Sequence, residues 1–223
     1  MQDGGLHLEP SGSRPVLSAV YRESHLQRRM INIQITKQDL RRRLRSTRLD
    51  VAPARRAEAA TMAAAHFENI PDWSSCQRLA LYQPIPEEFD PEPIAAAARS
   101  RGLALYLPVI NDDKGLSFAL WQEEEDLICN RYGIPEPAPH ARRLAAAELD
   151  MVVLPLVGWD RQGGRLGMGG GYYDRALADA GDVIRVGLGY ASQECTSLTL
   201  DPWDIPMHFV VTERELMTAP TTV

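Results

Sequence analysis

The chain has 223 residues, 44% hydrophobic and 24% charged, which excludes disordered and fibrous classes and indicates a globular protein. Its formal net charge of −6 argues against a nucleic-acid backbone as its main ligand. No run approaches the roughly 18 to 20 apolar residues of a membrane-spanning helix, and no secretion signal is visible, so we expect no membrane partner. The three cysteines lack CxxC spacing, and we expect reduced thiols in a cytoplasmic protein.

The first part of the chain divides into a tail and a helix. Residues 1–35 mix glycine, serine, proline and charge without sustained periodicity, and we expect a poorly ordered tail before a single domain of residues 36–223. Residues 35–49 place leucines four apart on one face of a predicted amphipathic helix, with Lys37 and Arg41 on another face. From spacing alone, this basic pair is more typical of a solvated face than of a ligand site.

The following elements alternate between helix and strand. A helix is predicted over residues 53–67, and another ends at Gly102, where glycine is favoured as a stop. Strands are predicted at residues 78–85, 103–110, 116–122, 151–159, 183–190 and 208–213, with a loop-rich acidic stretch at 123–148 and a helix from 172 to 180. This alternation predicts an α/β fold, a single three-layer domain around a central, mostly parallel sheet.

The most apolar strand, residues 151–159, is followed by a loop with unusual glycine content. Residues 163–171 contain six glycines in nine positions, the others being Arg165, Leu166 and Met168. Glycine at this density permits positive φ and close backbone approach, so that successive N–H groups can form an anion-binding nest. A helix from Tyr172 would follow directly, and Arg165 could supply a guanidinium to a phosphate.

The same glycine content fits a flexible hairpin equally well. The position of the loop, directly after a buried strand and directly before a helix, favours a ligand cradle. It is not a Walker loop, because the chain contains no GKS or GKT, and it fits a dinucleotide fingerprint poorly. The five histidines have no metal-ligand or triad spacing, so zinc and hydrolase functions lack support.

Residues 154–177, LPLVGWDRQGGRLGMGGGYYDRAL, resemble the signature of the 5-formyltetrahydrofolate cyclo-ligases. Supporting motifs follow in the family's order: Lys37 with Arg41, EFD at 88–90, GIPEP at 133–137 and PWDI at 202–205. The resemblance runs from about residue 36 to the end. Trp159 stands where the family has phenylalanine, which is an exchange of one apolar aromatic residue for another.

The resemblance implies an enzyme that converts 5-formyltetrahydrofolate to 5,10-methenyltetrahydrofolate with ATP as co-substrate and Mg²⁺ as cofactor. ATP would phosphorylate the formyl oxygen, N10 would attack the activated carbon, and ADP and phosphate would leave. We expect a cytoplasmic monomer whose partners are these small molecules. Two alternatives stay open: another ATP- or phosphate-ligand enzyme on the same scaffold, and a non-catalytic nucleotide- or folate-binding module.

The resemblance also implies roles for individual residues. The catalytic candidates are Arg165 and Tyr173. The ATP-binding candidates are Lys37, Arg41, Arg165, Leu166, Gly167, Met168, Gly169, Gly170, Gly171, Tyr172 and Tyr173. The substrate-binding candidates are Gln83, Glu88, Met168, Gly169, Gly170, Gly171 and Tyr172, and the metal candidates are Asp174 and Asp204. Without the resemblance, Asp174 would equally suit a favourable helix start, and Glu88 a solvated loop.

Overall fold

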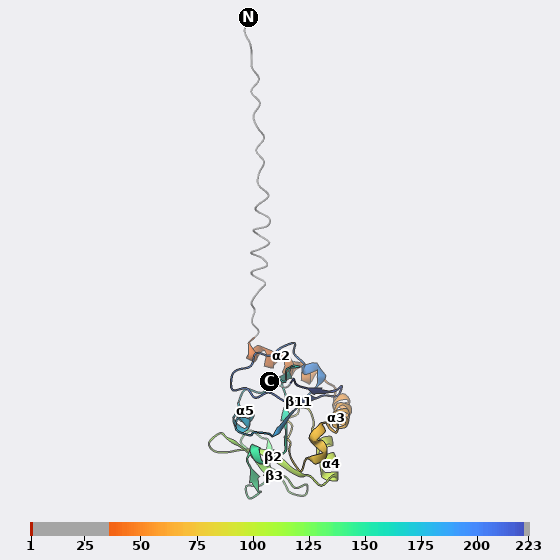
Figure 1. Ribbon diagram of the computed structural model, residues 1–223, viewed down its shortest axis with the longest axis vertical. Helices are drawn as coiled ribbons and strands as arrows, with labels where there is room; N and C mark the ends of the chain where they lie inside the picture. The colour runs from red at the N-terminus through yellow and green to blue at the C-terminus, as the bar shows by residue number, and fades with distance from the viewer. Residues whose placement is uncertain (2–35, 221–223) are drawn as a thin grey trace. The chain divides into compact units, whose positions relative to one another are not determined.

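The computed structural model describes Met1 and residues 36–220, and every described helix and strand lies within the unit Lys37–Val223, one of two into which the chain divides (Figure 1). The predicted tail, residues 1–35, lies outside the described residues apart from Met1. Across the part that is described, no helix has the length and apolar character needed to cross a membrane.

An eight-stranded sheet forms the centre of this unit. Its inner strands all run parallel, in the order β11 (Phe209–Val211), β10 (Ile184–Leu188), β7 (Met151–Pro155), β1 (Arg78–Ala80) and β2 (Ala104–Ile110). Antiparallel pairs complete the edges: β12 (Leu216–Thr218) pairs with β11, β3 (Leu116–Leu120) pairs with β2, and β6 (Arg143–Leu144) pairs with β3. The prediction of a mostly parallel sheet is confirmed.

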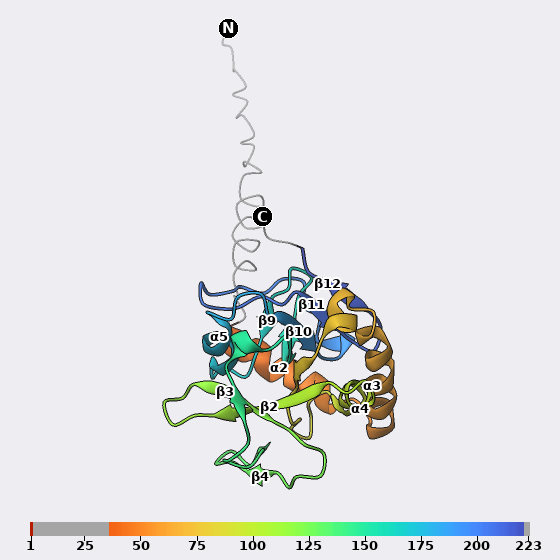
Figure 2. The ribbon, with the colours of Figure 1, turned by 60° about the horizontal axis from the view of Figure 1, so that its bottom comes forward.

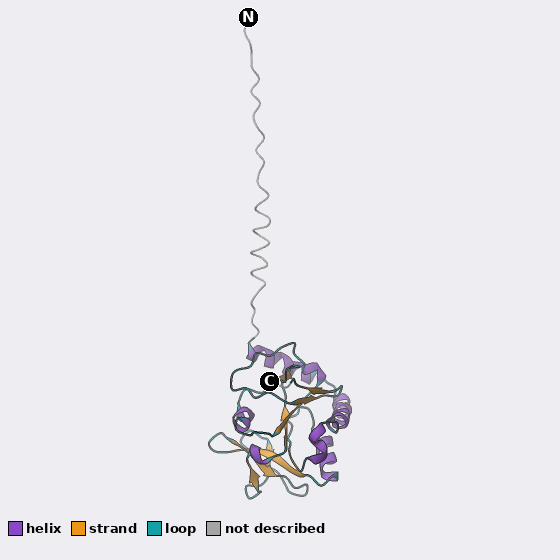
Figure 3. Cartoon of the chain, viewed as in Figure 1, coloured by secondary structure: helices purple, strands orange, loops and turns teal. Residues whose placement is uncertain are grey.

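Helices cover both faces of the sheet (Figures 1 and 3). Helices α3 (Pro53–Phe67) and α4 (Glu92–Ser100) pack on one face, where Phe67 joins a core cluster with Leu79 of β1. Helix α5 (Tyr172–Leu177) packs on the other face, where Leu177 shares a cluster with Val152 of β7. Because both faces are buried, the inner strands need continuous apolar runs, as the sequence has them. The expected three-layer α/β architecture is confirmed.

Helix α2 (Lys37–Leu49) covers the segment that follows β7, since Leu44 packs against Val157 and Leu166 in a small separate cluster. The remaining elements are short: η1 (Pro71–Ser75), β4 (Ile128–Cys129), β5 (Pro135–Glu136), η2 (Ala146–Glu148), β8 (Gly158–Trp159), β9 (Arg165–Leu166) and η3 (Ala191–Gln193).

Several predicted boundaries are wrong for identifiable reasons. The strand predicted over residues 78–85 ends at Ala80, and the segment after it contains Pro84 and Pro86, which have no N–H to donate to a ladder. The strand predicted over 151–159 divides into β7 and β8. Strand β12 was not predicted.

The predicted stop of α4 is confirmed. Gly102 has φ of 75°, its N–H donates to the Arg99 carbonyl, and the Leu103 N–H donates to the Ala98 carbonyl. This is the Schellman arrangement, which satisfies carbonyls left over at a helix end. Leu103 is thereby directed back toward the sheet, where β2 begins one residue later.

Candidate functional site

A cavity of about 680 Å³ opens where the carboxyl ends of β1, β2 and β7 meet α2 and α5. In open α/β sheets, ligands bind at this edge. Every residue that the sequence proposed for a site lines it, namely Lys37, Arg41, Gln83, Glu88, Arg165, Leu166, Gly167, Met168, Gly169, Gly170, Gly171, Tyr172, Tyr173, Asp174 and Asp204. Segments more than 160 positions apart in sequence therefore share one cavity, since Lys37 and Asp204 are separated by 167 positions.

The glycine-rich loop has two parts with different tasks. Its first part belongs to a small hairpin in which β8 pairs with β9 and Asp160 fills the turn. The Asp160 carboxylate accepts hydrogen bonds from the N–H groups of Gln162 (3.0 Å), Gly164 (2.8 Å) and Leu198 (2.7 Å). Residues 158–166 therefore form a hairpin, and the cavity is lined by its last two residues, Arg165 and Leu166, together with residues 167–171.

Gly163 in the hairpin is required by backbone conformation and by space. Its φ is 82°, and a Cβ there would lie 2.5 Å from the Met207 carbonyl oxygen and 2.9 Å from Ala219 Cβ. Gly163→Ala is expected to lower the free energy of unfolding by about 3 kcal/mol, because left-handed strain adds to a backbone clash. Gly181→Ala is the matched control, because Gly181 has φ of 58° but no atom lies within 4 Å of the added Cβ. This substitution is expected to lower the free energy of unfolding by only about 1 kcal/mol.

Urea unfolding of both variants measures this difference. Equal losses of stability in the two variants would contradict the assigned clash at Gly163 and leave only the cost of the left-handed backbone.

The second part of the loop is held open by its glycines and by Arg41. Gly169 and Gly171 have φ of 98° and 64°, and Gly171 is the residue before the first turn of α5. Arg41 Nε donates to the Gly167 carbonyl at 2.8 Å, so α2 fixes the loop from outside. Helix α5 has only six residues, so its dipole is short, and binding of an anion here depends on loop N–H groups and nearby cations.

Arg165 lies between the loop and α5. Its side chain is 7% exposed, and one terminal nitrogen donates to Asp174 Oδ1 at 2.8 Å. Its Nε is buried and has no hydrogen-bond partner among residues 36–220. The guanidinium carbon lies 5.8 Å from the centre of the Tyr173 ring. The cavity wall thus carries a guanidinium with unused donor capacity, which suits an anionic ligand.

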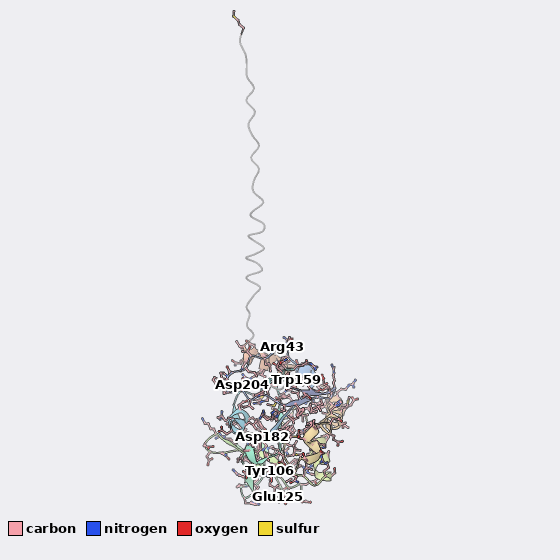
Figure 4. All side chains as sticks on the ribbon, in the orientation of Figure 1. Arg43, Tyr106, Glu125, Trp159, Asp182 and Asp204 are labelled. Carbon is pink, nitrogen blue, oxygen red and sulfur yellow. The ribbon has the colours of Figure 1, made fainter. Side chains whose placement is uncertain are left out.

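Lys37 and residues of the PWDI segment form another part of the cavity wall. Lys37 Nζ donates to Asp201 Oδ2 at 2.6 Å and to Asp204 Oδ2 at 2.7 Å. Figure 4 labels Asp204 close to α2, the helix that carries Lys37. Burial alone would raise the pKa of Asp204, but hydrogen bonds from Lys37 and from the Asp201 N–H outweigh it and hold the pKa below its usual value. Asp204 is therefore ionised at neutral pH.

The predicted metal residues are each paired with a cation. Asp174 binds Arg165, and Asp204 binds Lys37. Within the described chain, no group of three or more histidine, cysteine, aspartate or glutamate side chains is placed to hold a metal ion. Asp174 Oδ2 and Asp204 Oδ1 take part in no hydrogen bond among the described residues, so each carboxylate keeps one oxygen available. Such a donor set fits a Mg²⁺–nucleotide complex, which needs only one or two protein carboxylates.

Glu88 is a nearly buried carboxylate in the same cavity. Its side chain is 8% exposed, and its Oε2 accepts the Ile85 N–H at 3.2 Å. Burial raises the pKa of this carboxyl despite that hydrogen bond. Burial also raises the pKa of Tyr173 well above its usual value, so this hydroxyl stays protonated and can only donate or accept a hydrogen bond. Gln83 follows Tyr82, whose hydroxyl donates to the Phe89 carbonyl at 2.7 Å and so fixes the loop that carries Glu88.

The pattern of the 5-formyltetrahydrofolate cyclo-ligase family matches residues 33–213 of the chain. This chain belongs to that family. A 5-formyltetrahydrofolate cyclo-ligase of Escherichia coli is 32% identical over 178 residues, which cover 78% of this chain and 98% of the relative. The protein of that name from Haemophilus influenzae is 30% identical over 176 residues, covering 77% and 94%. The family resemblance expected from the sequence is confirmed.

Solved structures agree with this membership. The NMR structure of Aquifex aeolicus 5,10-methenyltetrahydrofolate synthetase superposes with a TM-score of 0.73 at 28% identity, covering 84% of this chain and 94% of that one. A 5,10-methenyltetrahydrofolate synthetase from Mycoplasma pneumoniae has a TM-score of 0.66 at 19% identity, which supports the fold alone. The cyclo-ligase fold therefore extends over nearly all of the described residues.

The family member's cavity also contains residues that the sequence did not assign. They are Ile85, Asn130, Tyr132, Glu136, Asp201 and Trp203, together with apolar residues of the strand ends. Tyr132 lies in the segment between β4 and β5, and its hydroxyl lies 3.1 Å from the hydroxyl of Tyr172. Figure 2 labels β4 below β2 and β3. The GIPEP motif beside Tyr132 was the available signal, but it carried no assigned role.

Proposed function

We propose that this chain is a 5-formyltetrahydrofolate cyclo-ligase, which uses ATP and Mg²⁺ to form 5,10-methenyltetrahydrofolate, ADP and phosphate. One observation carries this proposal: cations, glycine backbone and a nearly buried carboxylate line a single cavity. Such a cavity offers cations and backbone N–H groups to a polyphosphate, and a carboxylate acceptor to a flat ring with hydrogen-bond donors. We assign the activity to residues 36–223, as a monomer in the cytoplasm, where its three free thiols would stay reduced.

In this proposal Lys37 and Arg41 of α2, Arg165 of β9 and residues 167–171 of the loop, all of which line the cavity, orient ATP. The side-chain cations and the loop N–H groups would bind its phosphates. Phosphoryl transfer needs little covalent chemistry from a protein, so positioning and charge stabilisation do most of the work. Arg165 is suited to the transferred group, since its guanidinium is nearly buried and keeps donors unpaired.

Glu88 would accept paired hydrogen bonds from the donor edge of the pterin. This leaves the formyl oxygen toward Arg165 and the loop. Tyr173 stays protonated and lies beside Arg165, so it can donate a hydrogen bond to oxygen as charge develops there. N10 then attacks the activated carbon, and the phosphate leaves with the oxygen. Gln83, Met168 and Tyr172 would line the ring systems.

Asp174 and Asp204 would hold the Mg²⁺ that accompanies ATP, through the carboxylate oxygens that the protein leaves unpaired. When bound, the ion supplies charge neutralisation on the phosphate oxygens. The chain's own contribution is to hold the two carboxylates in place through the ion pairs with Arg165 and Lys37.

The assignment of Lys37 to ATP predicts a selective spectroscopic response. The chain has two lysines, Lys37 at the cavity and Lys114, which does not line it. After reductive ¹³C-methylation, which keeps the charge, ATP with Mg²⁺ is expected to shift the Lys37 signal and leave the Lys114 signal unchanged. Single Lys37→Arg and Lys114→Arg variants assign the two signals. A shift confined to Lys114 would contradict the phosphate role of Lys37.

The activity itself is tested by mixing the purified full chain with 5-formyltetrahydrofolate, MgCl₂ and ATP and following the absorbance of the methenyl product. We expect product only when all three components are present. ATP binding without product under these conditions would refute the cyclo-ligase proposal and leave only a nucleotide site.

A further inference from the structure

Arg48 is a fully buried cation behind the wall of the cavity. Its side chain is 0% exposed, and one terminal nitrogen donates to the Leu156 carbonyl at 3.2 Å. Leu156 itself lines the cavity. Nε and the second terminal nitrogen of Arg48 have no hydrogen-bond partner within residues 36–220. Because a guanidinium stays protonated in proteins, such a residue needs nearby negative charge.

Two neighbouring carboxylates supply that charge, and they are not equivalent. Glu87 Oε1 lies 3.6 Å from Arg48 but accepts a shorter hydrogen bond, 2.7 Å, from the half-exposed Arg45. Glu88 Oε1 lies 3.9 Å from Arg48 and 8% of the Glu88 side chain is exposed. Among the described residues, Arg48 is the only cation within 4 Å of the Glu88 carboxylate.

We infer that Arg48 is a positioning residue that keeps Glu88 ionised and directed into the cavity, an inference that rests on the proposed role of Glu88 in binding the folate. Arg48 joins α2, the loop that carries Glu88 and the end of β7 at one point. It acts through Glu88, because it does not line the cavity.

The groups around Glu88 set the direction of the effect. Burial favours the neutral acid, whereas the Ile85 N–H, Arg48 and, more weakly, Arg45 favour the carboxylate. Glu87 on the same loop, Tyr82 after β1 and Tyr173 on α5 also face it, and both tyrosines stay neutral because burial raises their pKa values. From α3, Arg56 donates to the Pro86 carbonyl of the same loop at 2.5 Å. Removing Arg48 therefore lets Glu88 take up a proton at higher pH than in the native protein.

The pH dependence of KM for 5-formyltetrahydrofolate tests the inference in the full chain at saturating ATP. In the native protein, KM should stay flat around neutral pH and rise only at acid pH, as Glu88 protonates. In Arg48→Met, which fills the space without the charge, the rise should begin about one pH unit or more higher, with kcat changed much less than KM. Arg48→Lys should restore part of the shift, and Arg45→Gln, a surface charge on the same helix, should have a smaller effect than Arg48→Met.

The Glu88→Gln variant separates this inference from the proposed function. Glutamine does not titrate, so the KM of this variant cannot change through protonation of residue 88. The pH dependence of its KM is therefore the baseline that reports titration of the substrate. An unchanged KM in Glu88→Gln would refute the folate role of Glu88, and the inference with it. If KM is raised in Glu88→Gln but the pH dependence of KM in Arg48→Met superposes on the native one, the inference about Arg48 is overturned and the folate role of Glu88 stands.

A further measurement keeps the inference testable even where Arg48→Met does not fold. A native KM that already rises between pH 8 and pH 7, relative to the Glu88→Gln baseline, would show Glu88 protonated despite Arg48. That result would overturn the inference without any Arg48 variant.

Discussion

Arg165→Ala is expected to lower kcat by about 10²- to 10³-fold, the loss typical when one donor to developing transition-state charge is removed. The guanidinium is 7% exposed, holds Asp174 at 2.8 Å and keeps a buried Nε unpaired, so alanine removes a charge in a partly desolvated place. The apparent KM for ATP should rise as well, since the phosphate loses a charge-assisted pair. Steady-state kinetics with ATP and 5-formyltetrahydrofolate measure both.

Two variants control for trivial causes. Arg161 belongs to the same hairpin, but its side chain is 52% exposed, pairs with Glu194 and Glu215 and does not line the cavity. The kinetics of the Arg161→Ala variant should therefore stay near native. Arg165→Lys keeps the charge but not the fork geometry, and it should recover only part of the activity. Near-native kcat in folded Arg165→Ala would contradict the assigned role.

Glu88→Gln is expected to raise KM for 5-formyltetrahydrofolate by about 10- to 100-fold, because a charge-assisted pair of roughly 1.5–3 kcal/mol is lost. The amide also turns a donor toward the donor edge of the pterin. The KM for ATP should change little, because Lys37 and Arg165, which are proposed to hold ATP, pair with aspartates and not with Glu88. Competition by the substrate against a fluorescent folate analogue would confirm that binding is weakened.

Glu87→Gln provides the matched comparison one residue away. Glu87 pairs with Arg45 and does not line the cavity, so its loss should leave the folate KM close to native. If Glu87→Gln and Glu88→Gln raised the folate KM equally, the total charge of the loop would explain the effect, and the specific role of the Glu88 carboxylate would be contradicted.

Much of this fold can be predicted from local sequence because buried parallel strands require uninterrupted apolar runs. MVVLP and ALYLPVI meet that requirement, and Gly102 ends α4 through its own backbone conformation. Strand ends are harder to predict. The apolar run after Ala80 continues, but prolines remove donors and the chain leaves the sheet to form the cavity wall. Strand β12 has no distinctive pattern, and only its pairing with β11 makes it a strand.

The candidate site could be predicted where adjacent residues form a recognisable pattern, as in the glycine loop, and where the family's motifs gave distant residues a common role. Arg48 had neither signal. It is one arginine in a helix rich in arginine, and its complete burial depends on how Leu156 and the Glu88 loop pack around it. Tyr132 and Trp203 likewise reach the cavity through tertiary packing.

The ion pairs of Lys37 with Asp201 and Asp204 have a consequence for synthesis of the protein. They join residues 164 and 167 positions apart, so the proposed phosphate site is incomplete until nearly the whole domain has left the ribosome. A nascent chain that stops before Asp201 can pair β1, β2 and β7, but it lacks the aspartates that hold Lys37. Nucleotide at a hundred times its Kd would raise the free energy of unfolding of the complete domain by about 2.7 kcal/mol. The incomplete chain, which lacks the finished site, would not gain this stabilisation.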